Sequence, residues 1–260
     1  SAFEVLSYRW GVASIVLIVF GWLSGCNFRL AGKDWGVVFL LSLLRAVTSF
    51  SLIIAYQNIA SGVASTIHFM YPLAVALAMM FFFREKKSLL VILAVLMSLL
   101  GAALLSLGEL EAKSGNTMVG LVAACVSVFS YAGYIVGVRT TRAVQINSTA
   151  LTCYVMGLGT IFYLIGAYCT SGLQLVSDGY TWLIILGLAL PATAISNITL
   201  VQAIKYAGPT LTSILGAMEP LTAVVIGVFV FKELFTVNSA VGIILILLAV
   251  SIVVFRRQKS

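Results

Sequence analysis

The residue with the clearest chemical potential is Glu219, a carboxylate followed by Pro220 inside an apolar stretch that spans residues 211–233. An ionisable group at the depth of a lipid bilayer costs roughly 3 kcal/mol or more, so it persists where it faces other helices, water or a ligand. Arg45 is the only other full charge that we expect well inside an apolar segment. Glu219 could take up a proton or a substrate cation, and Arg45 could bind a substrate carboxylate. The alternative is a buried ion pair that fixes helix packing at little net gain.

The segment around Glu219 has a counterpart in the first half of the chain. A shift of 148 positions superposes Pro72 on Pro220 without a gap. In the later copy, helical spacing predicts a shared face for Thr212, Gly216, Glu219 and Ala223. The same shift relates these four positions to Ala64, His68, Tyr71 and Val75. Each copy therefore carries its polar residues at the same two levels of one helical face.

A second polar group recurs in the same way. Arg45, Thr48 and Ser49 are spaced i, i+3 and i+4, and the shift places them on Thr193, Ser196 and Asn197. Polar residues that recur at equivalent depths favour a shared aqueous cavity.

Aromatic and imidazole side chains add further candidates. His68 is the only histidine, and its ordinary pKa near 6.5 suits a proton relay, although a hydrogen-bonded packing role is the alternative. Ser127, Tyr131 and Tyr134 lie on one face of a predicted helix, where tyrosines could stack on a ligand or simply pack. The candidate substrate or ion site thus consists of Glu219, Arg45, His68, Tyr71, Ser49, Asn197, Tyr131 and Tyr134.

Composition determines the class of protein that carries these residues. Hydrophobic residues make up 62% of the 260, charged residues 9%, and the mean hydropathy is +1.14. Such values predict an all-α integral membrane protein, because barrel strands would alternate over about 10 residues. The net charge of +7 comes from short loops and not from a continuous stripe, so no nucleic-acid partner is expected. No cysteine or histidine spacing predicts a metal site, and no cofactor is expected.

Apolar runs predict nine transmembrane helices. Their ranges are Leu6–Leu23, Trp35–Ala55, Gly62–Phe83, Leu89–Leu107, Met118–Val138, Leu151–Tyr168, Tyr180–Ala203, Thr210–Phe231 and Val237–Phe255.

The shift of 148 relates the first four predicted helices to the last four and leaves Met118–Val138 without a counterpart. We therefore expect inverted five-helix repeats, with the first helix missing from this chain; the alternative is a natural nine-helix protein. The expected domains are a first repeat over 1–107, a second over 116–255 and a basic cytoplasmic tail over 256–260. Repeats of five helices enter the membrane in opposite senses, as in many secondary transporters.

Basic residues predict the orientation. With the C-terminus on the cytoplasmic side, that side carries eleven Lys and Arg residues and the other carries three, namely Arg9, Lys113 and Lys232. The positive-inside rule therefore predicts a cytoplasmic C-terminus.

These motifs resemble the EamA family of the drug/metabolite transporter superfamily. The resemblance covers essentially the whole chain and includes Phe83-Arg84-Glu85, Phe231-Lys232-Glu233, Leu44-Arg45-Ala46, Glu219-Pro220 and Tyr206-Ala207-Gly208-Pro209. It implies a transporter in a bacterial inner membrane with both termini cytoplasmic. Its substrates would be amino acids, nucleotide-like metabolites, sugars or drugs.

We therefore expect a secondary active transporter that exports a small polar metabolite by alternating access, with protons as a candidate coupling ion. The alternatives are a membrane-embedded enzyme acting on a lipid-linked substrate and a passive channel or structural membrane protein. An enzyme is not expected, because a metal-ligand cluster, a Ser-His pair and paired carboxylates are missing from the predicted spans.

Overall fold

The computed structural model describes residues 1–84, 89–106, 115–170, 176, 178–216, 218–229 and 237–258, and the regular secondary structure of this part is all helical. The nine predicted ranges are mainly helical wherever they are described. Six helical stretches are long and apolar enough to cross a membrane: Ala2–Leu23, Gly32–Asn58, Val63–Phe82, Thr117–Thr140, Ser148–Thr170 and Gly179–Ala207. Shorter apolar helices cover Leu89–Gly101 and Ala240–Ile252. The chain is an all-α, multi-pass membrane protein.

The chain divides into two units. Unit 1 comprises Ser1–Phe50 and Gly137–Tyr206, and unit 2 comprises Ser51–Val136 and Ala207–Ser260. The elements of unit 1 are α1 (Ala2–Leu23), η1 (Gly32–Asp34), the first part of α2 (Trp35–Asn58), the end of α6 (Thr117–Thr140), η3 (Arg142–Gln145), α7 (Ser148–Thr170), α8 (Gly179–Ala189), η4 (Leu190–Ile195) and α9 (Ser196–Ala207). Unit 2 holds the rest of α2 and α6 with α3 (Ser61–His68), α4 (Tyr71–Phe82), α5 (Leu89–Ser106), α10 (Pro209–Leu215), α11 (Met218–Phe229) and α12 (Val237–Gln258).

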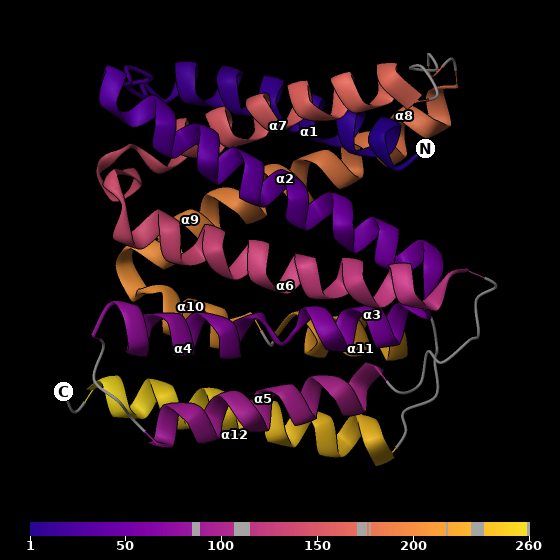
Figure 1. Cartoon of the computed structure of the whole chain (residues 1–260), viewed down its shortest axis with the longest axis vertical. Coiled ribbons are helices and arrows are strands. Elements are labelled where there is room, and N and C mark those ends of the chain that lie inside the picture. Colours follow the sequence, from indigo (N-terminus) through magenta and orange to yellow (C-terminus); the bar gives the residue numbers. More distant parts are fainter. Residues whose placement is uncertain are drawn as a thin grey trace. The chain divides into compact units, whose positions relative to one another are not determined.

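In unit 1, α1 and α7 lie against each other because small residues let them approach. A Cβ added to Gly159 would collide with the ring of Trp10, and one added to Gly166 would collide with Phe3. The later residue of α7, Gly166, contacts the earlier residue of α1, Phe3, so the two helices are antiparallel. Figure 1 shows the same opposite directions in the colours of the two ribbons.

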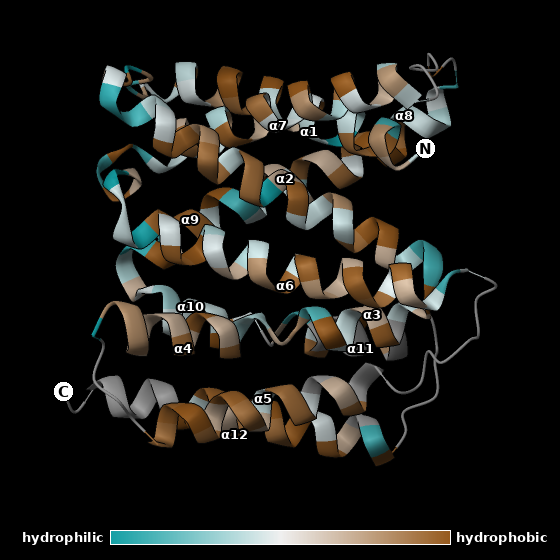
Figure 2. Ribbon diagram, in the orientation of Figure 1, coloured by the Kyte–Doolittle hydropathy of each residue, from teal (hydrophilic) through white to brown (hydrophobic). Residues whose placement is uncertain are grey.

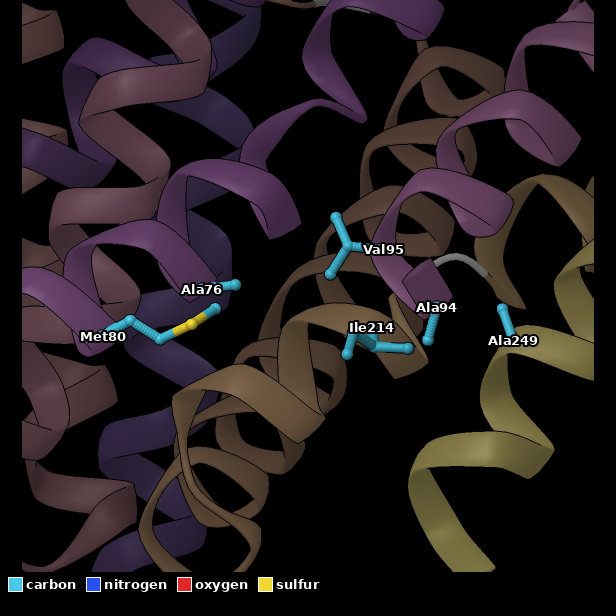
Figure 3. Close-up of a cluster of buried hydrophobic side chains, with 6 residues drawn as sticks. All are labelled: Ala76, Met80, Ala94, Val95, Ile214 and Ala249. Atoms are coloured by element: carbon cyan, nitrogen blue, oxygen red, sulfur yellow. The ribbon is translucent and has the colours of Figure 1, made fainter. Parts of the chain in front are cut away.

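Unit 2 has a comparable pair, α5 and α12. Gly101 of α5 lies so close to the Gly242 carbonyl and Ile246 that a Cβ would overlap with them. Six buried side chains form one apolar cluster between α4, α5, α10 and α12: Ala76, Met80, Ala94, Val95, Ile214 and Ala249 (Figure 3). The helices α5 and α12 also run in opposite directions (Figure 1).

The pairs that lie together are the pairs that the sequence shift relates. Shifting α1 by 148 gives the range of α7, and shifting α5 gives that of α12. Antiparallel contact between related helices, seen separately in each unit, is the arrangement that an inverted repeat requires.

Two predicted helices are interrupted, and proline explains where. Pro72 has no N–H and its ring collides with the carbonyl four residues earlier, which belongs to His68. Accordingly α3 ends at His68, and α4 starts at Tyr71 with Pro72 in its first turn. In the second copy α10 ends at Leu215 and α11 starts at Met218, so the interruption again comes about four residues before a proline. The predicted range Gly62–Phe83 matches a candidate membrane span over Val63–Phe82, and each of the two predicted ranges is divided between two helices.

A third proline produces a different distortion. Pro191 lies in η4, a π-helical turn between α8 and α9. The hydroxyl of Thr193 donates to the Leu188 carbonyl at 2.9 Å and so satisfies one group of the distorted turn. Figure 2 shows that hydrophobic residues dominate the helices and that hydrophilic residues interrupt α2 and α9.

Helix α8 begins with a side-chain cap. The carboxylate of Asp178 accepts from the backbone N–H groups of Thr181 at 3.0 Å and Tyr180 at 3.3 Å. These bonds, together with one from the Thr181 hydroxyl, lower the pKa of Asp178 because they favour its charged form.

Candidate functional site

The polar residues of unit 1 form one hydrogen-bonded network. Arg45 in α2 donates from Nε to the Asn197 side-chain oxygen at 3.1 Å and from Nη1 to the Ser49 hydroxyl at 3.2 Å. The Asn197 amide in turn donates to the Thr193 carbonyl at 2.7 Å. The four residues occupy equivalent positions in the two repeats, so the bond between Arg45 and Asn197 joins related helices. The structure thus brings together Arg45, Ser49 and Asn197, three of the predicted site residues.

The network extends to Arg9, which lies two turns inside α1. Its Nε donates to the Thr193 hydroxyl at 2.5 Å, and its Nη2 donates to the Ala192 carbonyl at 3.2 Å. Both acceptors belong to the π-helical turn. The sequence count assigned Arg9 to the non-cytoplasmic side, and the structure places it within α1, which begins at Ala2. Arg45 and Glu219 are therefore not the only charges inside the predicted spans.

Aromatic rings border the two arginines. The Arg45 guanidinium lies 6.0 Å from the centre of the Trp10 ring, within the range of a cation–π interaction. Trp10 meets Tyr163 edge to face at 5.1 Å, and the Tyr163 hydroxyl donates to the Ala46 carbonyl at 2.8 Å. Trp10 and Tyr163 are almost fully buried, so they exclude water from one side of the network.

Unit 2 has a second polar cluster, which is centred on His68 at the end of α3. His68 is 9% exposed, and its ring stacks on Tyr131 at 5.4 Å with an interplanar angle of 22°. Tyr131 meets Tyr71 edge to face at 4.6 Å. Tyr134, one turn further along α6, is fully buried. The structure therefore brings together His68, Tyr71 and Tyr131 at the interruption between α3 and α4.

Hydrogen bonding assigns the tautomer of His68. Its Nδ1 lies 2.9 Å from the Ser127 oxygen, and the Ser127 hydroxyl donates its only proton to the Ala124 carbonyl at 2.6 Å. Nδ1 must therefore carry the proton of that contact and donate to Ser127.

The residues of the predicted polar face are all buried in the first copy but not in the second. Ala64, His68, Tyr71 and Val75 are all buried. In the second copy Thr212 is 6% exposed, but Glu219 in the first turn of α11 is exposed. Thr212 and Glu219 lie in different helices, α10 and α11.

Glu219 and Thr212 flank the second interruption. The Glu219 N–H donates to the Gly216 carbonyl at 3.0 Å. The Thr212 hydroxyl is buried and has no hydrogen-bond partner among the described residues. Gly216 lies against the Tyr71 hydroxyl so closely that a Cβ would overlap with it. Polar groups of both copies therefore gather where the backbone is irregular.

A separate cavity of about 430 Å³ lies elsewhere in unit 1. Its walls are Ser14, Ile18, Phe28, Trp35, Cys153, Tyr154, Gly157, Leu158 and Ile161. None of these residues belongs to the predicted site. Within the described ranges, the His, Cys, Asp and Glu side chains form no group of three that could hold a metal ion.

Sequence reasoning missed Arg9, Trp10 and Tyr163 as members of the unit 1 cluster. A signal for Arg9 was present in Ser1-Ala2-Phe3-Glu4, which has the spacing of a capping box. That box is formed in the structure and places the start of α1 at Ala2. Arg9 then lies about 11 Å along the helix from its start, which is inside the span.

Comparison with known proteins adds to this geometry. An uncharacterized transporter of Archaeoglobus fulgidus is 28% identical over 238 residues, which cover 90% of this chain and 83% of that protein. The crystal structure of another protein, 18% identical, matches the fold with a TM-score of 0.82 over 99% of this chain and 89% of its own. The sequence model of the EamA-like transporter family matches residues 1–107 and 118–255. The chain belongs to the EamA-like transporter family of the drug/metabolite transporter superfamily.

Proposed function

We propose that this membrane transporter is a secondary active carrier that exports a small polar metabolite by alternating access. The paired interruption of related helices is the observation that supports this most. Both α3/α4 and α10/α11 break about four residues before a proline, at positions that the shift of 148 relates. Short helices in corresponding positions of two repeats are a feature of substrate sites in secondary transporters, where irregular backbone lines a cavity.

In this proposal the two repeats are residues 1–107 and 116–255. The protein lies in the inner membrane, and its C-terminal tail after residue 255 is cytoplasmic. Arg45, Ser49 and Asn197 bind polar groups of the substrate. Tyr71, Tyr131 and Tyr134 provide rings and hydroxyls for contact with it. Glu219 and His68 are the groups that take up protons, because a carboxylate and an imidazole, which both titrate below pH 8 in water, lie beside the interruptions.

An imposed pH gradient tests whether transport is coupled to protons. The full chain is reconstituted into proteoliposomes that contain a mixture of labelled amino acids and organic acids, and efflux is followed by mass spectrometry with and without an imposed pH gradient. Glu219→Gln should reduce the gradient-driven efflux and leave the melting temperature unchanged. Equal driven efflux in the wild type and the variant would remove Glu219 from the mechanism.

A further inference from the structure

Arg9 differs from an ordinary structural arginine in the acceptors that it uses. Its two hydrogen bonds go to a hydroxyl and a backbone carbonyl, both neutral, in the π-helical turn η4. A guanidinium has five N–H donors in a planar fork, so three remain beyond the two bonds that the described residues provide. A positive charge held by neutral oxygens inside an apolar helix is costly unless an anion joins it.

A second guanidinium belongs to the same network. Thr193 accepts from Arg9 through its hydroxyl and from Asn197 through its carbonyl, and Asn197 accepts from Arg45. Arg45 also lies over Trp10, the neighbour of Arg9 in the chain. One bridge of two neutral residues, Thr193 in η4 and Asn197 in α9, therefore holds two arginines, which lie on α1 and α2. Both bridge residues are buried, Thr193 at 1% exposed and Asn197 at 3%.

The negative charge near this network is low. The described acidic residues of unit 1 are Glu4, Asp34 and Asp178. Asp178 caps α8 just before its span, Asp34 lies in η1 at the start of the span Gly32–Asn58, and Glu4 is in the first turn of α1. The described part of unit 1 is thus arranged to attract an anion into its apolar interior.

We infer that Arg9 and Arg45 together bind an oxyanion of the transported substrate, a carboxylate or a phosphate. This inference rests on the proposed function and narrows its substrate class to metabolites that carry at least one negative group. Guanidinium groups suit this role because they offer paired N–H donors that match two oxygens of a carboxylate or phosphate. Arg9 is a binding residue of the site, Thr193 is a positioning residue that acts through the arginines, and Asn197, which binds the substrate in the proposed function, also orients Arg45.

Thermal unfolding of the purified full chain in detergent tests the site without a transport assay. The probes are sodium succinate, inorganic phosphate and the neutral analogue succinamide at constant ionic strength. At least one of the two anions should raise the melting temperature in a saturable manner, whereas succinamide should not. Arg9→Gln should weaken the apparent affinity for that anion at least tenfold, Arg9→Lys should weaken it less, and the exposed loop variant Arg29→Gln should match the wild type.

Asn197→Asp provides a variant that is expected to fold. It places a carboxylate beside Arg45, where it takes the position of the anion's charge, so it should abolish the response to the anion. Equal stabilisation by succinamide and succinate, or an unchanged response in Arg9→Gln and Asn197→Asp, would overturn the inference. Protection by phosphatidylglycerol alone would also overturn it, because the oxyanion would then come from a lipid headgroup.

The outcome separates this inference from the proposed function. Saturable, Arg9-dependent anion binding with no flux of the same anion in proteoliposomes would retain the site and reject transport. Carrier-mediated flux of a neutral metabolite that is unaffected by Arg9→Gln would retain transport and reject the site.

Discussion

The polar cluster of unit 1 is cationic, whereas that of unit 2 is built from rings and hydroxyls around one titratable imidazole. In unit 1 the shift of 148 relates Arg45 to Thr193 and Ser49 to Asn197, and all four residues share one network. In unit 2 it relates His68 to Gly216, and only one copy supplies the imidazole. Positions that the shift relates therefore carry different side chains, and the chemistry of the two units differs accordingly.

The difference indicates a division of roles. Guanidinium groups keep their charge at any physiological pH, so unit 1 is suited to recognise a constant anionic group. An imidazole changes charge near neutral pH, so unit 2 is suited to respond to protons. The following experiments test that division, beginning with the largest expected effect.

Asn197→Leu should destabilise unit 1 strongly. It removes the acceptor of Arg45 Nε and the donor to the Thr193 carbonyl, and hydrogen bonds of charged groups contribute about 1.5–3 kcal/mol each. We expect the free energy of unfolding to fall by about 3 kcal/mol, measured by denaturant unfolding in micelles. Thr199→Val on the exposed side of α9 is the matched control. Equal stability of the two variants would mean that the network does not organise unit 1.

Gly216→Ala should destabilise unit 2 by about 2 kcal/mol, because the new methyl group overlaps with the Tyr71 hydroxyl. The φ of Gly216 is −59°, so alanine adds no backbone strain. Tyr71→Phe removes the colliding oxygen, and the double variant should recover at least half of the loss. Additive losses in the double-mutant cycle would show that Tyr71 and Gly216 are not coupled.

His68→Gln should cost about 1 kcal/mol of stability through the Ser127 bond, which is less than the unit 1 change because both partners are neutral. Its larger effect should be on pH dependence. In the proposed function His68 takes up a proton and becomes a cation stacked on Tyr131, so transport by the wild type should change over the range in which imidazoles ordinarily titrate, between about pH 5.5 and 7.5. Transport by His68→Gln should be flat over that interval. A pH profile identical to that of the wild type would assign the proton response to another group.

Asp178→Asn should have the smallest effect. The pKa of Asp178 is below its ordinary value of 3.8, so the carboxylate stabilises α8 at every pH above that value. This contribution disappears as the pH falls through the lowered pKa. The melting temperature of the variant should therefore be slightly lower at pH 7 and should converge on that of the wild type below about pH 4. A constant difference down to pH 3 would mean that the charge of Asp178 is irrelevant to the cap.

Much of the fold could be predicted from the sequence, because apolar length and the 148-residue repeat are properties of the chain itself. The link between Arg45 and Asn197 was foreseeable in part, since their helices are related. The interruption at Pro72 was not, because a proline in a membrane helix can also produce only a kink. That outcome depends on whether neighbouring groups satisfy the freed carbonyls.

Two features of the site lay beyond sequence reasoning for other reasons. The contact of Arg9 with Thr193 joins residues 184 positions apart and depends on the π-helical turn at Pro191. Glu219 is exposed although its spacing predicted a face shared with buried Thr212, and the two residues lie in different helices, α11 and α10. Periodicity describes residues within one helix, and it loses its meaning across such a break.

Counterflow in proteoliposomes tests alternating access most directly. Vesicles that contain the full chain are loaded with an excess of the unlabelled anion found by thermal unfolding and are diluted into a trace of the same labelled anion. A carrier exchanges one molecule for another, so the label should accumulate transiently above its external concentration and then decline. A steady approach to equal concentrations, with no such maximum, would contradict a carrier and indicate a channel.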